Sequence, residues 1–416
     1  MGLNPDVLVI GGGAVGICCA YYLHRQDLDV ALIEQDEIAS GCSGANAGLL
    51  VPSHSIPLAS PGALSLGLKS MFKPASPFYI RPRLDYQLFR WLWQFARSCR
   101  EKRMLAGLEK LRELNYASME LYQNLIEDEK LDCDYSQKGW LLAYKTAKEY
   151  QSAQEEAALL EKYGVAAKIL DTQETLAMEP TLKPDMAGSV FYPDDAHLDP
   201  KKFVTALAER CLEHGMTIQK ATKVNGFEIA NGQVIGVKTA QGLLKPGQIV
   251  LSVGAWSGQT ARLLGFGLPV QPAKGYSISI IRPNPCPTVP LYLSEAKVAV
   301  TPFRDRLRFA GTLELSGMSQ TISWRRVSAI RKAAEEYMES IEAGGEPEIW
   351  CGLRPCTPDG LPLIGRLASY RNVLVATGHA MLGIHLAPVT GKLIAQVACA
   401  QKPDIDLAPY RVDRFQ

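Results

Sequence analysis

The loop Gly11–Gly16, with the sequence Gly-Gly-Gly-Ala-Val-Gly, constrains the fold of this chain more than any other stretch. The apolar run Asp6–Ile10 before it predicts a buried strand of a parallel sheet, and Ile17–Leu23 after it predicts a helix packed on that sheet. A second strand is expected over Asp29–Ile33, followed by Glu34. Dinucleotides bind at a glycine-rich turn between a strand and a helix, so we predict a dinucleotide site here rather than a purely structural turn.

The three glycines at the G-x-G-x-x-G spacing each have a physical role. Gly11 permits the tight turn, Gly13 lets a diphosphate approach the backbone, and Gly16 lets the helix lie close to the strand. The diphosphate would then lie on the free N–H groups at the start of the helix, at Ala14 and Val15.

Glu34 follows this turn at roughly the twenty-residue spacing of the acid that binds an adenosine ribose. An acid at this position disfavours the 2′-phosphate of NADP, which leaves FAD and NAD as the alternatives. The segment Ser40–Gly48 comes next and consists almost entirely of small residues. Small residues let the backbone approach a flat polar ligand, so we expect a cofactor-facing loop rather than a flexible one. Its expected contacts are Ser43, Gly44, Asn46, Ala47 and Gly48.

Composition excludes several classes of protein. The 416 residues are 47% hydrophobic and 21% charged, as in an ordinary globular protein, and two domains are expected at this length. The net charge of +1 gives no support for nucleic-acid binding. The ten cysteines show no zinc-like spacing, so we expect no metal site, no disulfide framework and a reducing, cytoplasmic location. We expect no signal peptide, and no run of about eighteen apolar residues would span a membrane.

The stretch 85–130 is expected to be helical, and one of its apolar stripes is formed by Leu88, Trp91, Leu92 and Phe95. Basic and aromatic residues interleave over 86–103. One interpretation is a helix that packs on the core and leaves a solvated basic face. The other is a helix that makes peripheral contact with an anionic membrane, on its cytoplasmic side.

Two further buried strands, Gln248–Gly254 and Asn372–Gly378, are expected to extend the nucleotide-binding sheet, and helices are expected over 323–342 and 383–400. Three strands between 274 and 313 alternate as in a half-exposed antiparallel sheet. We therefore predict an α/β fold with a discontinuous Rossmann-like domain and a substrate-binding domain that has an antiparallel or mixed sheet and helices. The predicted segments are 1–85, 197–270 and 345–416 for the first domain, and 86–196 and 271–344 for the second.

Six stretches carry a family resemblance that covers nearly the whole chain. In chain order they are Gly11–Gly16, Ser43–Gly48, Ala196–Pro200, Ser252–Ser257, Gly352–Gly360 and Gly378–Gly383. Together they resemble the D-amino-acid oxidase superfamily of FAD-dependent oxidoreductases. Lys274–Ser277 and Arg306–Thr312 are similar to bacterial D-amino-acid dehydrogenases, and Leu386–Gly391 is similar to glycine oxidases. The resemblance implies that the cofactor is FAD rather than NAD, and that it is bound non-covalently.

The resemblance also implies the site residues. Arg354, in the sequence Gly-Leu-Arg-Pro, would hold the substrate carboxylate bidentately; the alternative is an arginine that ties a loop to a domain interface. A helix starting near Gly383 would direct its positive end at the flavin, and His379 would either bond to the flavin or be fixed by backbone contacts. Tyr276 and Tyr292 are candidate pocket hydroxyls or plain sheet-packing residues. The implied cofactor contacts in these regions are Gly254, Trp256, Arg354, Gly378, His379, Met381, Leu382 and Gly383.

The reaction implied is oxidative deamination of a free amino acid, either a D-amino acid or a D-proline-like one. Hydride would pass from the α-carbon to flavin N5, giving an imine and then an oxo acid and ammonia, and the electrons would pass to a quinone or another acceptor. Met381–Gly383 lacks the second arginine of glycine oxidases, which implies a more apolar pocket. The alternatives are an oxygen-using oxidase of glycine, sarcosine or another N-alkyl amino acid, a tRNA-modifying flavoenzyme, and a non-catalytic carrier.

Overall fold

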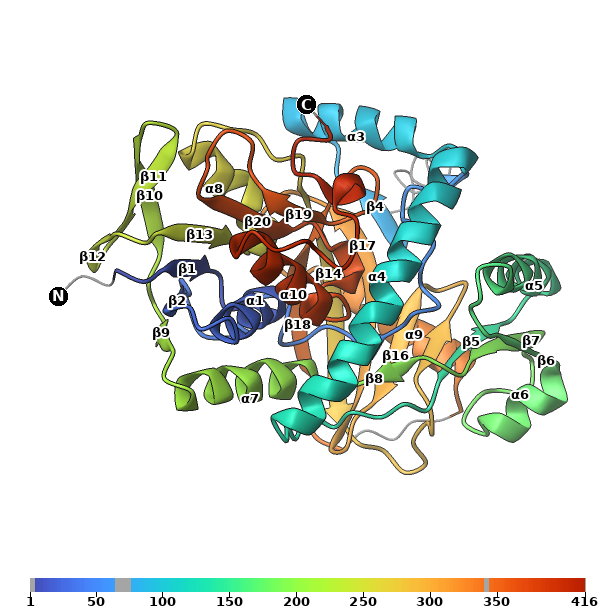
Figure 1. The fold of residues 1–416 in the computed structure, drawn as a ribbon. Coiled ribbons are helices and arrows are strands. Elements are labelled where there is room, and N and C mark those ends of the chain that lie inside the picture. Colours follow the sequence, from blue (N-terminus) through green and yellow to red (C-terminus); the bar gives the residue numbers. More distant parts are fainter. Residues whose placement is uncertain (1–3, 64–75, 340–343, 416) are drawn as a thin grey trace.

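The first of two large sheets is the predicted nucleotide-binding sheet. The computed structural model describes residues 4–63, 76–339 and 344–415, and Figure 1 shows how its elements are arranged. Six strands pair in the order β19-β20-β13-β1-β2-β9, and all of these pairs are parallel except that of β19 with β20. The bounds are β1 (Val7–Ile10), β2 (Val30–Ile33), β9 (Thr217–Gln219), β13 (Gln248–Leu251), β19 (Leu363–Arg366) and β20 (Val373–Thr377).

Both faces of this sheet are covered. One face carries the helices α1 (Ala14–His24), α7 (Pro200–Glu213) and α10 (Ala387–Ala398). The other carries α8 (Ser257–Leu263) and a three-stranded sheet of β10 (Val224–Ala230), β11 (Gln233–Thr239) and β12 (Gly242–Leu244). Val7 and Val9 pack toward the first layer, whereas Leu8 and Ile10 pack toward the second. This two-sided burial is why β1 is apolar at every position.

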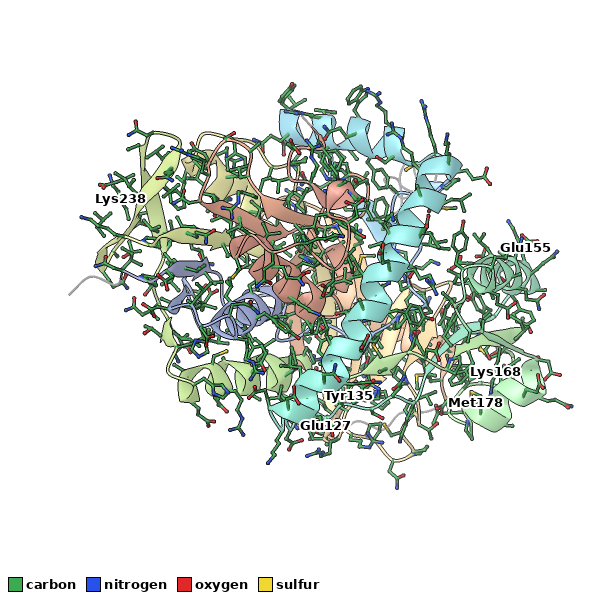
Figure 2. The ribbon with its side chains drawn as sticks, in the orientation of Figure 1. Glu127, Tyr135, Glu155, Lys168, Met178 and Lys238 are labelled. Atoms are coloured by element: carbon green, nitrogen blue, oxygen red, sulfur yellow. The ribbon has the colours of Figure 1, made fainter. Side chains whose placement is uncertain are left out.

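The second sheet has nine strands and is mixed. Its order is β18-β14-β17-β16-β15-β5-β7-β6, with β4 paired to β17; two of its pairs, β15 with β5 and β17 with β4, are parallel. The bounds are β4 (Phe78–Ile80), β5 (Trp140–Tyr144), β6 (Lys168–Leu170), β7 (Gly188–Tyr192), β14 (Gln271–Ile281), β15 (Leu291–Leu293), β16 (Val298–Pro302), β17 (Arg306–Leu315) and β18 (Glu348–Cys356). A two-stranded ladder joins β3 (Leu49–Leu50) to β8 (Ala196–His197). In Figure 2, the labelled Lys238 on β11 and Lys168 on β6 lie at opposite ends of the molecule.

The two faces of the nine-stranded sheet have different neighbours. The helices involved are α3 (Tyr86–Ser98), α4 (Glu101–Asp128), α5 (Ala147–Glu161), α6 (Thr172–Met178) and α9 (Trp324–Tyr337). Tyr276 and Leu141 point to the face covered by α9. Trp140 and Leu142 point to the opposite face, where α4, α5 and the segment after β3 pack. This second face is turned toward the nucleotide-binding sheet, because its core is continuous with that of α1 and α10.

Several local predictions are confirmed. The start of α7 also agrees with its local sequence, since Asp199 accepts hydrogen bonds from the N–H groups of Lys201 and Lys202 and Pro200 occupies the first turn. The stretch 85–130 is helical, as α3 and α4. The α/β fold class is confirmed. All ten cysteines are free, and Cys18 and Cys19 are fully buried in α1.

Two helix boundaries were predicted wrongly. The helix expected from Gly383 begins at Ala387, after a 3₁₀ turn over Ala380–Leu382, because Pro388 has no N–H and is tolerated only in a first turn. The helix expected to reach 342 ends at Tyr337, because Met338 is extended and pairs with Leu182. The last three positions of the expected helix, 340–342, lie outside the described residues.

The predicted domain segments stay a prediction, but sheet membership cuts across them at two places. β4 lies within 1–85 and β18 lies within 345–416, yet both strands pair in the nine-stranded sheet. The boundaries predicted at 85/86 and 344/345 therefore do not coincide with the places where the chain passes between the two sheets.

Candidate active site

A cavity of about 610 Å³ lies at the carboxyl ends of β1, β2 and β13. This is the edge at which ligands bind in open α/β sheets. Its lining begins at Gly11–Val15 and Glu34–Asp36 and continues through Ser40–Ser43 and Ser252–Trp256. Its far end is formed by residues of β18 and of the turn before α10, namely Leu353, Pro355, His379 and Gly383. The cavity therefore runs from the nucleotide-binding sheet to the edge of the nine-stranded sheet.

Glycine is required at two positions of the first turn. A Cβ at Gly16 would lie 1.8 Å from the carbonyl oxygen of Gly11, so α1 could not pack this closely on β1. Gly11 has φ +115°, and a Cβ there would meet the carbonyl oxygen of Ser252 at 2.6 Å. By contrast, a Cβ on Gly41 or Gly254 would meet no protein atom within 4 Å, and both residues line the cavity.

The start of α1 is prepared for an anion. Gly13 caps the helix without a side chain, and the first turn contains no acidic residue. The backbone N–H of Ala14 donates to Ser43 Oγ at 2.9 Å, and Val15 also lines the cavity. The Ala14 N–H, expected to be free, is therefore already bonded within the protein, and the positive end of the helix dipole is what favours a diphosphate here.

Glu34 is fixed at the end of β2. Its Oε2 accepts a 2.6 Å hydrogen bond from the Gly12 N–H, and its Oε1 accepts a 3.0 Å bond from the Asp36 N–H. The carboxylate is thereby held at the cavity, next to the glycine turn. This is the place expected of a ribose-binding acid.

The loop of small residues, Ser40–Gly48, lines the cavity only with its first part. Ser43 lines the cavity, whereas Gly44, Asn46, Ala47 and Gly48 lie behind it. Asn46 closes the loop on itself, since its Nδ2 donates to the carbonyls of Cys42 and Ser43 and its Oδ1 accepts from the Gly48 N–H. The carbonyls of Asn46 and Ala47 accept hydrogen bonds from the nine-stranded sheet, from Arg308 and Thr301. These residues therefore shape the loop and do not line the cavity.

Arg354 lies next to the cavity rather than in its lining. The two residues beside it on β18, Leu353 and Pro355, do line it. The guanidinium group lies over Gly275, where a Cβ would come within 2.1 Å of Nη1, and Nη1 donates to the Thr312 carbonyl at 2.7 Å. The guanidinium is thus held on the face of the sheet that is turned toward the nucleotide-binding sheet.

The two tyrosine candidates lie on opposite faces of this sheet. Tyr276 is 1% exposed, and its hydroxyl donates to Glu314 Oε2 at 2.9 Å on the α9 side, so it cannot share a pocket with Arg354. Of the two alternatives stated for Tyr276, sheet packing fits its position, because successive strand residues alternate between faces and Tyr276 follows Gly275. Tyr292 lies on the same face as Arg354. Burial raises the pKa of Tyr292, and the positive charge of Arg354 is close enough to oppose that rise.

The segment before α10 supplies two cavity residues of the five expected. His379 and Gly383 line the cavity, whereas Gly378 and Leu382 lie outside the lining and Met381 is 37% exposed. His379 Nε2 lies 2.9 Å from Thr390 Oγ1, and burial lowers the pKa of its imidazole to about 3. The ring is therefore neutral and is fixed by a side chain of α10.

Several lining residues have no local sequence signal. Thr222–Asn225 reach the cavity because the Thr222 N–H donates to the Glu34 carbonyl at 2.7 Å, a contact between distant segments. Gln320 also lines the cavity, and its carbonyl accepts a 2.8 Å hydrogen bond from Cys351 Sγ of β18. Cys42 belongs to the small-residue loop and could have been proposed from it; burial raises the pKa of its thiol to about 12, so it stays protonated. In the described part of the chain, no cluster of His, Cys, Asp and Glu is arranged to hold a metal ion.

Comparison with known proteins agrees with this geometry. The profile of the family described as FAD dependent oxidoreductase (DAO) matches residues 6–397. The chain belongs to this family. Its cofactor is therefore FAD, and the open glycines, the uncapped start of α1 and Glu34 fit the diphosphate and ribose of that cofactor.

Similar proteins extend over the whole chain. A D-amino acid dehydrogenase of Granulibacter bethesdensis is 31% identical, with 98% of this chain and 99% of that protein covered. A D-amino acid dehydrogenase of Agrobacterium fabrum is also 31% identical, with 99% of each covered. Glycine oxidase from Geobacillus kaustophilus has a similar fold, with a TM-score of 0.81 at 23% identity and 99% of each chain covered.

Proposed function

We propose that this FAD-dependent oxidoreductase oxidatively deaminates free amino acids, with D-amino acids as the preferred class. One observation carries the proposal: the Arg354 guanidinium lies over Gly275, beside the end of the FAD cavity. The two neighbours of Arg354 on β18, Leu353 and Pro355, line that cavity. A planar guanidinium binds a carboxylate bidentately, and free amino acids all present one. The 31% identity to D-amino acid dehydrogenases supports the choice of enantiomer.

FAD, when bound, accepts the hydrogen and electron pair of the substrate's α C–H bond. The protein's part is to position the substrate. Arg354 would hold the carboxylate, and its bond to the Thr312 carbonyl leaves the rest of the guanidinium for the ligand. The His379 ring, neutral and bonded to Thr390, keeps the far wall rigid and uncharged. The imine product would then hydrolyse to an oxo acid and ammonia.

An anaerobic screen of D- and L-amino acids tests this proposal. Bleaching of the flavin absorbance by D-amino acids, with little by L-amino acids, is expected. Reduction by no amino acid would overturn the proposal and would favour a carrier role. Peroxide formation in air at the rate of substrate consumption would identify an oxygen-using oxidase instead of a dehydrogenase that passes electrons to a quinone.

The quinone acceptor is proposed together with membrane contact through α3. The inner side of this helix is formed by the buried side chains of Leu88, Trp91 and Phe95. On its outer side, the side chains of Phe89 and Trp93 are 55% and 58% exposed. Arg97 lies over the Trp93 ring, 4.6 Å from its centre. The exposed basic residues of this stretch are Arg90, Arg97, Arg100, Lys102 and Arg103. Aromatic rings flanked by cations suit the interface of an anionic bilayer. None of the helices in the described part of the chain is long and apolar enough to cross a membrane.

Flotation with vesicles of anionic lipid tests this contact. The protein is expected in the top fraction, and a Phe89→Ser, Trp93→Ser double variant is expected to stay at the bottom. Trp324→Ser is the matched control, because Trp324 is 64% exposed on a different helix, α9. Equal flotation of both variants would remove α3 from the proposal and leave the oxidation of amino acids untouched.

A further inference from the structure

The sheet face that carries Arg354 also carries a row of small side chains. The strand register places Ser277, Ala310, Ala299 and Tyr292 side by side across β14, β17, β16 and β15. In the described part of the chain, Ala310 and Ala299 belong to none of the apolar clusters of the core. Adjacent strands are about 4.8 Å apart, so β15 lies roughly 10 Å from β17, to which Arg354 is bonded. A floor of small residues therefore separates the guanidinium from the Tyr292 ring.

An aromatic wall begins at Tyr292. Its ring lies 5.4 Å from that of Trp140, and the Trp140 ring lies 6.3 Å from that of His54. His54 is held from both sides: the Ser53 N–H and hydroxyl donate to the buried carboxyl of Asp195, and Ser55 Oγ donates to the Pro52 carbonyl. The backbone on both sides of His54 is thereby held in place, and the wall consists of three adjacent rings.

Two opposite charges stand at the outer edge of this wall. Lys297 Nζ lies 6.0 Å from the centre of the Tyr292 ring. Glu156 projects from α5, which packs Ala153 and Ala157 on the same side of the sheet as Trp140. Both residues remain accessible to solvent, although protein atoms crowd around the Glu156 carboxyl. Loss of hydration raises the pKa of the Glu156 carboxyl and the positive charge of Lys297 opposes the rise, so the two charges act on the same space.

We propose that the floor and wall from Ala310 to Trp140 form the subsite for the substrate side chain. The subsite selects a bulky, uncharged side chain. This rests on the proposed function, in which Arg354 holds the carboxylate at the other end of the floor. A large apolar side chain gains contact with the aromatic wall, which predicts a preference of about 10- to 100-fold over glycine. Lys297 repels a cationic substrate side chain and Glu156 repels an anionic one, so the subsite favours neither sign of charge.

Reciprocal neutral variants of the two exposed residues test the charge balance. The measurement is kcat/KM for methionine, glutamate and lysine, each as the enantiomer that the wild-type protein oxidises. Glu156→Gln is expected to raise the glutamate-to-methionine ratio about 5-fold and to lower the lysine-to-methionine ratio; Lys297→Gln is expected to do the reverse. Glu155→Gln is the matched control on α5, where Glu155 is labelled in Figure 2, and should leave both ratios unchanged. Ratios that stay within 2-fold, or that shift in the same direction in both variants, would overturn the subsite.

The floor is tested by filling it. Ala299→Leu is expected to lower kcat/KM for phenylalanine and methionine at least 10-fold and for alanine less than 3-fold, with the flavin content unchanged. An equal loss for all three substrates would contradict the inference. A wild-type protein that oxidises no amino acid would instead overturn the proposed function itself, so the two failures are distinguishable.

Discussion

The cofactor edge and the substrate face of this protein are built in different ways. At the cofactor edge, the Gly12 N–H, the Ser43 hydroxyl and the Glu34 carboxylate meet within one strand–turn–helix–strand unit and the loop after it. On the substrate face, Arg354 contacts Thr312 and Gly275, and Tyr292 lies on yet another strand. Backbone sterics set the first region, whereas strand pairing between distant segments sets the second. FAD binding at the cofactor edge should therefore be lost when a single atom is added there. Substrate binding should be lost when a single side chain of the substrate face is shortened.

Gly16→Ala should have the largest effect. Its Cβ would lie 1.8 Å from the backbone oxygen of Gly11, which no rotamer change can relieve. We expect a loss of about 3 kcal/mol in the free energy of unfolding and the loss of most bound flavin. Flavin content and thermal unfolding measure both. Gly267→Ala is the control, because a Cβ there meets no atom within 4 Å; equal losses in the two variants would contradict the packing argument.

Arg354→Ala breaks the substrate face and should leave the cofactor edge intact. A hydrogen-bonded charge pair is worth about 1.5–3 kcal/mol, so KM should rise roughly 10- to 150-fold. Arg354→Lys keeps the charge but loses the planar fork, so it should recover only part of the loss. Steady-state kinetics and the flavin spectrum give the two readouts. An unchanged KM with full flavin content would remove Arg354 from carboxylate binding.

Glu34→Gln weakens the cofactor edge without adding bulk. The Gly12 N–H and the ribose then lose a charged acceptor, which should weaken FAD binding about 10-fold. Titration of the flavin-free protein with FAD gives the dissociation constant. Glu37→Gln serves as the comparison, because the Glu37 side chain is 70% exposed and pairs with Lys220. A similar loss in both variants would mean that local charge, and not the position of Glu34, governs FAD affinity.

The buried carboxyl of Asp195 makes the stability of the folded protein depend on pH. Burial raises the pKa of its carboxyl to about 8, although hydrogen bonds from Ser53 oppose the rise. The unfolded chain releases this proton near pH 4, so between pH 4 and 8 the folded state binds one more proton and stability falls as pH rises. Asp195→Asn, which resembles the protonated acid, should flatten that fall by at least about 1 kcal/mol between pH 5 and 8. Parallel stability curves for wild type and variant in urea unfolding would refute this.

Tyr276→Phe should have the smallest effect on activity. The hydroxyl lies on the α9 side, where Glu314 keeps its ion pair with Arg326 after the change. We expect kcat/KM to stay within about 2-fold and stability to fall by about 1 kcal/mol. Tyr292→Phe is the same change on the other face and should alter KM more. If Tyr276→Phe were the more damaging to KM, the assignment of the two faces would be wrong.

Sequence reasoning worked best where the physical cause is local. The dipeptide Asn231-Gly232 is a strong local signal for a hairpin turn, and both residues have positive φ in the turn between β10 and β11. The acid Asp199 directly before Pro200 is a local signal for a helix start, and it caps α7. The start of α10 was missed, although Pro388 marks it, because the apolar pattern continues across the turn before it. The role of Asn46 was missed because its partners are backbone groups of its own loop. The first error concerns where a helix begins, and the second concerns which atoms one side chain contacts.

The sequence by itself determined the glycine turn, the acid at its end and the class of ligand that they hold. Each depends on φ, ψ and contacts within one unit, so residue type and spacing are sufficient. Only the tertiary structure decided that β18 pairs with β14, that Arg354 shares a face with Tyr292 and that Tyr276 does not. A strand shows which residues alternate, but the neighbour it pairs with, and the face that is buried, depend on segments far away in the chain.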